Sequence, residues 1–209
     1  MTEQPQWEGP NGPWNKIETN IDYVYAIDNA VPDWMVRSLE EQFYRVPMEW
    51  NHYSTPVSKP FLGRTFYNQR TGQNEQAPYG VYALFDLIKY HVIKAVDPDA
   101  EFLDLVRINL NGYPRGFGGT RHVDFDDDVR IWSAVYFLND SDGDLRFWRA
   151  PGSPEIVIDA GYIKGRLIMF PSCYEHEALP PNADLRMTLN FGFRMNSKLN
   201  ELAYVGESK

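Results

Sequence analysis

Three side chains in the second half of the sequence have the types and spacing of a metal-binding group. His122 and Asp124 are two residues apart, so on an extended backbone both side chains point to the same side of the strand. His176 lies about 50 residues further along and supplies a second imidazole. Two imidazoles and one carboxylate would occupy one face of a metal ion and leave the opposite face open. The spacing therefore predicts a metal centre with open positions.

This set of ligands is typical of non-heme Fe(II) oxygenase centres. The pair His122 and Asp124 alone is weak evidence, because 29 of the 209 residues are acidic and a histidine often has an acidic neighbour by chance. The alternative is that His122 is a loop histidine beside the solvated acidic run Asp126 to Asp128. The prediction therefore depends on the elements that surround these residues.

The composition indicates a globular chain, and we expect residues 1–209 to form one domain. No apolar run approaches the ~18 residues of a membrane span, and the N-terminus lacks a secretory pattern. The single cysteine, Cys173, excludes an intramolecular disulfide and agrees with a cytoplasmic location. A net charge of -9 opposes binding to a phosphate backbone. We therefore expect neither a nucleic acid partner nor a membrane partner.

We expect the elements before residue 100 to form the structural support of the site. Residues 1–20 are rich in glycine and proline and predict an irregular arm. Residues 21–100 predict one strand followed by two helices, at Pro32 to Arg45 and at Tyr79 to Val96, where apolar residues recur with helical spacing. The second helix would bury His91 on its apolar face.

After residue 100 the polarity of the sequence alternates with a period of two, which predicts strands. Polar residues share one side of two of these strands, and apolar residues fill the other side. A polar strand face usually meets solvent, but in a double-stranded barrel it can line an interior that binds a ligand, while helices cover the apolar outside. The residues on the polar side are Arg107, Asn109, Asn111 and Tyr113 in one strand, and Arg186, Thr188 and Asn190 in the other.

Glycine-rich turns separate further short strands, whereas the segment from residue 47 to residue 78 predicts only loops and short extended pieces. The strands are expected at residues 131–139, 144–148, 155–159 and 165–170, with the first two joined as a hairpin. We therefore predict an α+β, mainly β chain. Its core would be a jelly roll (a cupin-like double-stranded β-helix) at 101–195, with the N-terminal helices packed on its outer face and a C-terminal tail at 196–209.

Taken in order, these segments resemble the Fe(II)- and 2-oxoglutarate-dependent dioxygenase superfamily, and within it the prolyl-hydroxylase-like branch. Residues before 100 contribute little to the resemblance. The matching pieces are Tyr113-Pro114, His122-Val123-Asp124, Val135 to Asn139, Gly143 to Phe147, Gly165 to Phe170, His176, Pro180 and Arg186.

The resemblance implies that His122, Asp124 and His176 ligate Fe(II) and carry the catalysis through it. It implies that Arg186 binds the far carboxylate of 2-oxoglutarate, which a bidentate guanidinium matches. Phe137 departs from the pattern, because some prolyl hydroxylases have a second cosubstrate tyrosine there. The other residues that we predict to bind the cosubstrate are Thr188, Tyr113, Leu145 and Asn109.

The implied reaction is oxidative decarboxylation of 2-oxoglutarate to succinate with dioxygen, coupled to hydroxylation of a substrate C–H bond. Ascorbate is a candidate additional cofactor. We expect a peptidyl residue of a peptide or protein as the substrate, proline first. A small free molecule such as an amino acid is the alternative within the same reaction class, and a non-catalytic cupin-like binding module is the alternative of another class.

The loop between Pro114 and Arg121 contains three glycines and Phe117, and its composition predicts a lid over the open metal face. A peptide substrate would need a loosely held loop beside an open groove. A rigid loop that closes a pocket of roughly 300 Å³ would favour a small molecule instead.

Overall fold

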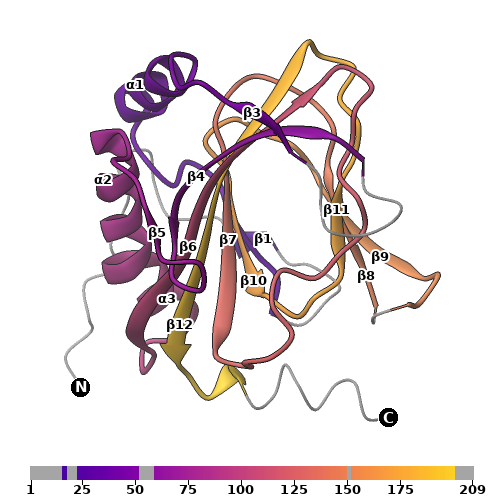
Figure 1. The fold of residues 1–209 in the computed structure, drawn as a ribbon. Coiled ribbons are helices and arrows are strands. Elements are labelled where there is room, and N and C mark those ends of the chain that lie inside the picture. The colour runs from indigo at the N-terminus through magenta and orange to yellow at the C-terminus, as the bar shows by residue number, and fades with distance from the viewer. Residues whose placement is uncertain (1–15, 18–22, 52–58, 150–151, 201–209) are drawn as a thin grey trace.

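The chain forms two antiparallel sheets that face each other, with helices on one side (Figure 1). The structure is a computed structural model, and it describes residues 16–17, 23–51, 59–149 and 152–200. This mainly β architecture with few helices is a jelly roll and confirms the fold predicted from the sequence.

The large sheet has the strand order β1-β2-β10-β7-β12-β6-β4-β3, with β5 paired to β4, and the small sheet has the order β11-β8-β9. The strands of the large sheet are β1 (Lys16–Ile17), β2 (Tyr25–Ile27), β3 (Glu49–Asn51), β4 (Phe61–Asn68), β5 (Gln73–Asn74), β6 (Glu101–Pro114), β7 (Ile131–Phe137), β10 (Leu167–Pro171) and β12 (Leu185–Asn196). Those of the small sheet are β8 (Leu145–Trp148), β9 (Ile156–Ala160) and β11 (His176–Ala178).

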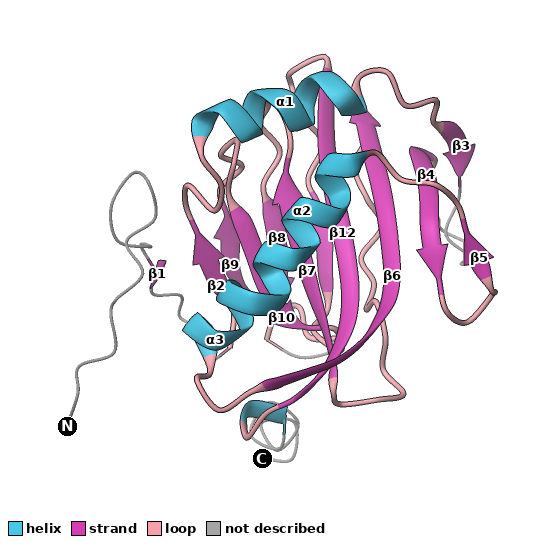
Figure 2. Cartoon of the chain, turned by 90° about the vertical axis from the view of Figure 1, so that its left-hand side faces the viewer, coloured by secondary structure: helices cyan, strands magenta, loops and turns pink. Residues whose placement is uncertain are grey.

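The helices cover the outer face of the large sheet (Figure 2). Helix α1 (Asp33–Phe43) lies within the predicted range, and the second predicted helix consists of α2 (Tyr79–Leu87), the π-helical turn η1 (Ile88–Val92) and α3 (Ile93–Val96). Within the described ranges, none of these helices is both long and apolar enough to cross a membrane.

Strands β6 and β12 pair with each other along almost their whole length. One face of this pair belongs to the hydrophobic core, and the other faces the interior of the barrel. Leu110 and Leu189 point outward and pack in the same buried cluster as Leu39 of α1 and Leu84 of α2. The alternate residues of both strands point inward, because successive side chains of a strand face opposite sides. The polar face predicted from the sequence therefore lies inside the barrel.

The predicted hairpin between residues 131–139 and 144–148 is wrong. Strand β7 lies between β10 and β12, whereas β8 pairs with β11 and β9 in the other sheet. The turn between β7 and β8 is fixed to the loop before β12, because Asp142 accepts hydrogen bonds from the backbone N–H groups of Asn182 and Ala183. These contacts direct the chain across to the second sheet.

Strand β4 corrects the prediction of loops and short pieces between residues 47 and 78. It has eight residues and pairs with β6. A register shift between Thr65 and Tyr67 interrupts its alternation, so Gly63 and Phe66 are its buried positions. A bulge of this kind removes the period of two by which a strand is recognised in a sequence.

His91 is exposed and does not lie in the core as predicted. It belongs to the π-helical turn, in which Ile88 and Val92 are buried. A π turn contains more residues than an α turn, so it shifts the positions that face the sheet.

The ends of the chain are described in part. Of the arm at residues 1–20, Lys16–Ile17 pair with β2 as the short strand β1; the other residues of the predicted arm lie outside the described ranges. Of the tail at 196–209, residues 196–200 are described, and the predicted tail beyond them lies outside. Asn200 is buried, and its Oδ1 accepts a hydrogen bond of 2.9 Å from Nε1 of Trp132.

Candidate active site

His122, Asp124 and His176 converge although they come from different parts of the chain. His122 and Asp124 lie between β6 and β7, and His176 is the first residue of β11. The two histidines face each other in a β-bridge, with backbone N–H···O distances of 3.0 and 2.9 Å. The candidate ligand atoms of the three residues lie within 4.8 Å of one another. The group predicted from the spacing therefore has the geometry of a metal site.

Both imidazoles have one ring nitrogen fixed by a backbone carbonyl. Nδ1 of His122 donates to the carbonyl of Thr120 at 2.6 Å, and Nδ1 of His176 donates to that of Tyr174 at 2.8 Å. With Nδ1 as the donor, Nε2 of each ring carries the lone pair, and both Nε2 atoms lie near the carboxylate of Asp124. Burial and the neighbouring His122 lower the pKa of His176 to about 4, so this imidazole is neutral near pH 7, as a metal ligand must be.

Asp124 is a charged carboxylate between the two imidazoles. Its oxygens Oδ1 and Oδ2 lie 3.8 Å from Nε2 of His122 and of His176, respectively. Ser133 donates to Oδ2 at 2.6 Å, and Arg107 forms an ion pair with Oδ1. Burial acts to raise the pKa of Asp124, but the charge of Arg107 and these other contacts outweigh it and hold this pKa well below its usual range.

A cavity of about 180 Å³ connects the three residues to Arg186. All five residues predicted to bind a cosubstrate line it: Tyr113, Leu145, Arg186, Thr188 and Asn109. Besides these and the three candidate ligands, the cavity is lined by residues to which no role was assigned from the sequence, of which Arg107, Asn111 and Asn190 lie on the predicted polar face and the others are Phe61, Val123, Val135 and Ala178.

Arg186 is held at one end of this cavity, and its exposed fraction is 1%. Its Nε donates to the carbonyl of Gly143 at 2.7 Å. Its Cζ lies 5.0 to 5.5 Å from the ring centroids of Tyr113, Phe137 and Tyr162. The backbone and the aromatic faces thus fix a planar cation inside the protein, where a carboxylate would bind strongly.

Phe137, the position that departs from the family pattern, is covered by Tyr162. The two rings stack with centroids 4.3 Å apart. Burial raises the pKa of Tyr162 to about 12, although the charge of Arg186 acts to lower it. The hydroxyl of Tyr162 lies 2.6 Å from the carbonyl of Met187. This tyrosine therefore supports the wall of the cavity and does not reach into it as the missing tyrosine would.

Gly143 positions Arg186, because its carbonyl accepts the hydrogen bond from Nε of that residue. Its φ of 87° would be strained for a residue other than glycine. A Cβ at this position would lie 2.5 Å from the carbonyl oxygen of Leu179. We expect Gly143→Ala to lower the free energy of unfolding by on the order of 3 kcal/mol, measured by urea denaturation. Gly152→Ala is the control, because Gly152 also has a positive φ, of 76°, but open space around it. Equal losses in the two variants would contradict the proposed close contact.

Two residues beside Asp124 were missed from the sequence, Ser133 and Ser172. The backbone N–H of Asp124 donates to the carbonyl of Ser172 at 3.0 Å, and the hydroxyls of the two serines lie 2.9 Å apart. A signal for Ser133 existed, because it is a polar residue on the same side of β7 as Val135 and Phe137. No local signal marks Ser172, which follows the end of β10.

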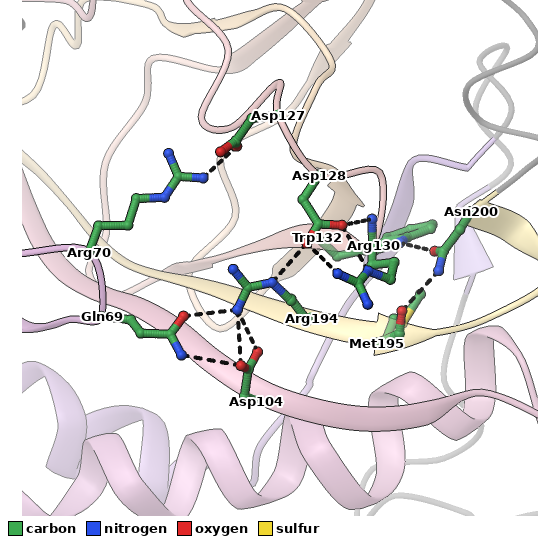
Figure 3. A network of polar contacts seen from close by, with 10 residues as sticks. All are labelled: Gln69, Arg70, Asp104, Asp127, Asp128, Arg130, Trp132, Arg194, Met195 and Asn200. Atoms are coloured by element: carbon green, nitrogen blue, oxygen red, sulfur yellow. Dashed lines mark hydrogen bonds and ion pairs between the residues drawn. The ribbon is translucent and has the colours of Figure 1, made fainter.

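Arginine side chains pair with two residues of the acidic run that follows Asp124 (Figure 3). Asp128 accepts hydrogen bonds from Arg130 and from Arg194, at distances near 2.9 Å. Asp127 pairs with Arg70. Asp126 and Asp127 are exposed, as the alternative interpretation expected, but the ion pairs of Asp127 and Asp128 lie outside the residues that line the cavity.

The loop from Arg115 to Arg121 is packed and is not the loosely held lid that its glycines suggested. Its backbone donates from Gly116 to the carbonyl of Pro181 at 2.9 Å and from Gly119 to that of Ala178 at 2.7 Å. A Cβ on Gly118 would lie 2.9 Å from the oxygen of Ala178. The glycines therefore permit close packing against the strand that carries His176.

Two exposed aromatic side chains contact each other where β3 meets the loop that follows β6. Trp50 of β3 and Phe117 of the loop are 56% and 41% exposed, and their ring centroids are 5.8 Å apart. Phe61, on the neighbouring strand β4, lines the cavity and stacks on Tyr113, whereas Trp50 pairs with Leu62 and lies on the other face of the sheet. The exposed ring of Phe117 lies in the loop between two residues that line the cavity, Tyr113 and His122.

Comparison with protein families identifies this arrangement. The family model described as the 2OG-Fe(II) oxygenase superfamily matches residues 108–194, which include all three candidate ligands and Arg186. Over this segment the chain is similar to the 2OG-Fe(II) oxygenase superfamily. The comparison with curated proteins finds no matching sequence.

Solved structures of 2OG-Fe(II) oxygenases share the fold of the chain. A Pseudomonas putida prolyl-4-hydroxylase has 24% identity and a TM-score of 0.56, covering 82% of this chain and 92% of that one. A 2OG-Fe(II) oxygenase family oxidoreductase from Burkholderia pseudomallei has 16% identity and a TM-score of 0.63, covering 82% and 84%. A Trichoplax adhaerens prolyl hydroxylase in complex with a hypoxia inducible factor peptide fragment has 16% identity and a TM-score of 0.58, covering 91% and 89%.

The description of the matching family names Fe(II) and 2-oxoglutarate, and the residues present fit both. Two Nε2 lone pairs and an ionised carboxylate suit Fe(II). A buried guanidinium at a distance from them, in the same cavity, suits the second carboxylate of a dianionic cosubstrate.

Proposed function

We propose that the chain is a Fe(II)- and 2-oxoglutarate-dependent dioxygenase that hydroxylates a peptidyl residue, with proline as the first residue to test. The observation that supports the reaction class is the presence of the metal-binding group and Arg186 in one cavity. A non-catalytic cupin-like module would have no use for a buried arginine that suits a carboxylate. An enzyme with a dicarboxylate cosubstrate requires one.

In this proposal the chain's residues bind and orient the reacting groups. His122 and His176 would bind Fe(II) through Nε2, because their Nδ1 atoms donate to carbonyls. Asp124 would bind through a carboxylate oxygen. When bound, Fe(II) and 2-oxoglutarate supply the reaction of dioxygen that releases succinate and carbon dioxide and hydroxylates a C–H bond.

The other end of the cavity would hold the cosubstrate. Arg186 would donate to its far carboxylate, and the hydroxyl of Thr188, on the same face of β12, would add a further donor. Leu145 and Val135 are buried at the cavity wall and would exclude water from the cosubstrate. The charge of Arg186 would then act in surroundings of low polarity.

The exposed aromatic pair supports a peptide as the substrate. Trp50 and Phe117 contact each other, Phe117 lies in the loop between Tyr113 and His122, and exposed aromatic side chains bind extended and proline-rich peptides. Two of the similar structures are prolyl hydroxylases, and one of these contains a peptide. These observations favour a peptidyl residue over a free molecule.

Phe117→Ala tests this preference. We expect the variant to lose at least about tenfold in kcat/KM for a proline-containing peptide, because removing a stacked aromatic contact costs roughly 1.4 kcal/mol or more. The rate at which 2-oxoglutarate is consumed without peptide should stay unchanged. Tyr79→Ala, which removes an 84% exposed ring at the start of α2, should change neither rate. Equal losses in both reactions of Phe117→Ala would argue against a peptide site at Phe117.

A small free molecule remains the second candidate, and the packed loop favours it. The backbone bonds of Gly116 and Gly119 hold the loop from Arg115 to Arg121 against residues 178–181. A peptide substrate would need a loosely held loop, and this loop is held by backbone hydrogen bonds. Succinate formation measured in parallel with proline-containing peptides and with free amino acids separates the two candidates. Stimulation by amino acids alone would exclude the peptidyl substrate.

A further inference from the structure

Arg107 places a positive charge beside the candidate metal ligands. It lies on β6, lines the same cavity as Arg186, and donates from Nη2 to Oδ1 of Asp124. A guanidinium stays charged at all working pH values and cannot ligate a metal. Arg107 is therefore a cation in contact with a residue that the proposed function assigns to a divalent cation.

Asp124 has orienting contacts besides Arg107. The hydroxyl of Ser133 donates to Oδ2 at 2.6 Å and lies 2.9 Å from the hydroxyl of Ser172. The backbone N–H of Asp124 is bound to the carbonyl of Ser172. Two contacts on the other side thus hold the carboxylate and its backbone. What Arg107 adds to these contacts is its positive charge.

Phe125 fixes the position of Arg107. The Cζ of Arg107 lies 4.7 Å from the centroid of this buried ring, and the Cζ of Arg70 lies 4.6 Å from it. The side chain of Arg107 is 20% exposed, and that of Asp124 is 6% exposed. Charges this poorly solvated interact more strongly than they would in water. Arg107 thus has little freedom to move away when a second cation arrives.

We propose that Arg107 is the counter-ion of the metal-free site: it compensates the buried charge of Asp124 when no metal is bound, and it weakens the binding of a divalent cation by repulsion. The proposal rests on the proposed function, because it takes Asp124 as a metal ligand. In this proposal Arg107 lowers the affinity for the metal, whereas a residue that supports the ligands would raise it. The metal-free protein would remain folded, and its metal would exchange more readily than the three ligands alone would allow.

The test is the affinity of metal-free protein for Mn(II), measured by titration calorimetry, together with Tm with and without Mn(II). Arg107→Met removes the charge and keeps an apolar side chain over Phe125. We expect it to bind Mn(II) at least about tenfold more tightly than the wild type. Its metal-free form should lose several degrees in Tm, because a buried carboxylate loses its partner, and Mn(II) should restore most of the loss. Arg107→Lys retains the charge and should retain the wild-type affinity.

A merely structural role of Arg107 would give another result. Arg107→Met would then lower Tm equally with and without Mn(II), and its affinity for Mn(II) would be unchanged or weaker; either finding overturns the proposal. Arg107→Gln, which is also uncharged but keeps an N–H donor, replaces Arg107→Met if that variant does not fold. Asp124→Ala distinguishes a failure of the counter-ion proposal from a failure of the proposed function. If Asp124→Ala loses Mn(II) binding but Arg107→Met or Arg107→Gln does not bind Mn(II) more tightly, only the counter-ion proposal is refuted. Unchanged binding in Asp124→Ala refutes the ligand assignment as well.

Discussion

Asp124→Ala is expected to abolish the formation of succinate from 2-oxoglutarate. The substitution removes the only anionic member of the candidate ligand group. Residues that merely support a metal ligand typically change affinity 10- to 100-fold, so loss of a ligand should weaken Fe(II) binding by more than about 100-fold. Succinate measured by mass spectrometry with excess Fe(II) and 2-oxoglutarate gives the activity, and calorimetric titration with Mn(II) gives the affinity.

The control for this variant is Asp159→Ala. Asp159 also pairs with an arginine, because Arg146 donates to both of its oxygens at 2.7 and 2.8 Å, but this pair lies outside the residues that line the cavity. Asp159→Ala should keep full activity. Circular dichroism should show that both variants are folded. Undiminished succinate formation by folded Asp124→Ala would refute the proposed metal site.

Arg186→Leu is expected to cause a large rise in the apparent KM for 2-oxoglutarate. The substitution removes a buried, charged and bidentate partner from the far carboxylate, which should cost about 2 to 5 kcal/mol of binding. The lower value corresponds to a rise of roughly 30-fold in KM. Steady-state rates of succinate formation over a range of 2-oxoglutarate concentrations provide the measurement.

Two further variants make this result specific. Arg186→Lys keeps the charge but loses the planar fork, so its KM should lie between those of the wild type and Arg186→Leu. Arg146→Leu removes a guanidinium from the ion pair outside the cavity and should leave KM unchanged. Affinity for Mn(II) in the absence of 2-oxoglutarate should stay the same in all three variants. A normal KM in Arg186→Leu would show that the cosubstrate binds elsewhere.

The parts of the site that could be predicted from the sequence are those encoded by spacing within one strand. His122 and Asp124 share a side of the backbone because they are two residues apart, and Arg186 and Thr188 do so for the same reason. The alternation of polar and apolar residues in β6 and β12 distinguished the interior face from the core face. In the structure the polar residues line the cavity and the apolar residues lie in the core. The resemblance then joined these local signals to His176.

The parts that could not be predicted depend on contacts between distant segments. Strand β8 pairs with the second sheet because the turn before it is held by residues 182 and 183, which lie about 40 positions later in the chain. Ser172 reaches Asp124 only because β10 ends beside the loop that follows β6. The close approach of Gly118 to Ala178 likewise has no local signature, so its glycine was interpreted as a source of mobility.

The counter-ion at Arg107 shows a further limit of the sequence. The alternation placed Arg107 on the polar face with Asn109 and Tyr113, but a pattern of polarity does not distinguish a residue that binds a ligand from one that opposes it. The distinction comes from its contact with Asp124 and from the ring of Phe125.

A crystal structure of the chain with Mn(II) and 2-oxoglutarate tests the central claim most directly. We predict Mn(II) bound to Nε2 of His122, to a carboxylate oxygen of Asp124 and to Nε2 of His176. We predict the far carboxylate of 2-oxoglutarate paired with the guanidinium of Arg186. Mn(II) bound away from these three residues, or a 2-oxoglutarate carboxylate bound without Arg186, would contradict the account.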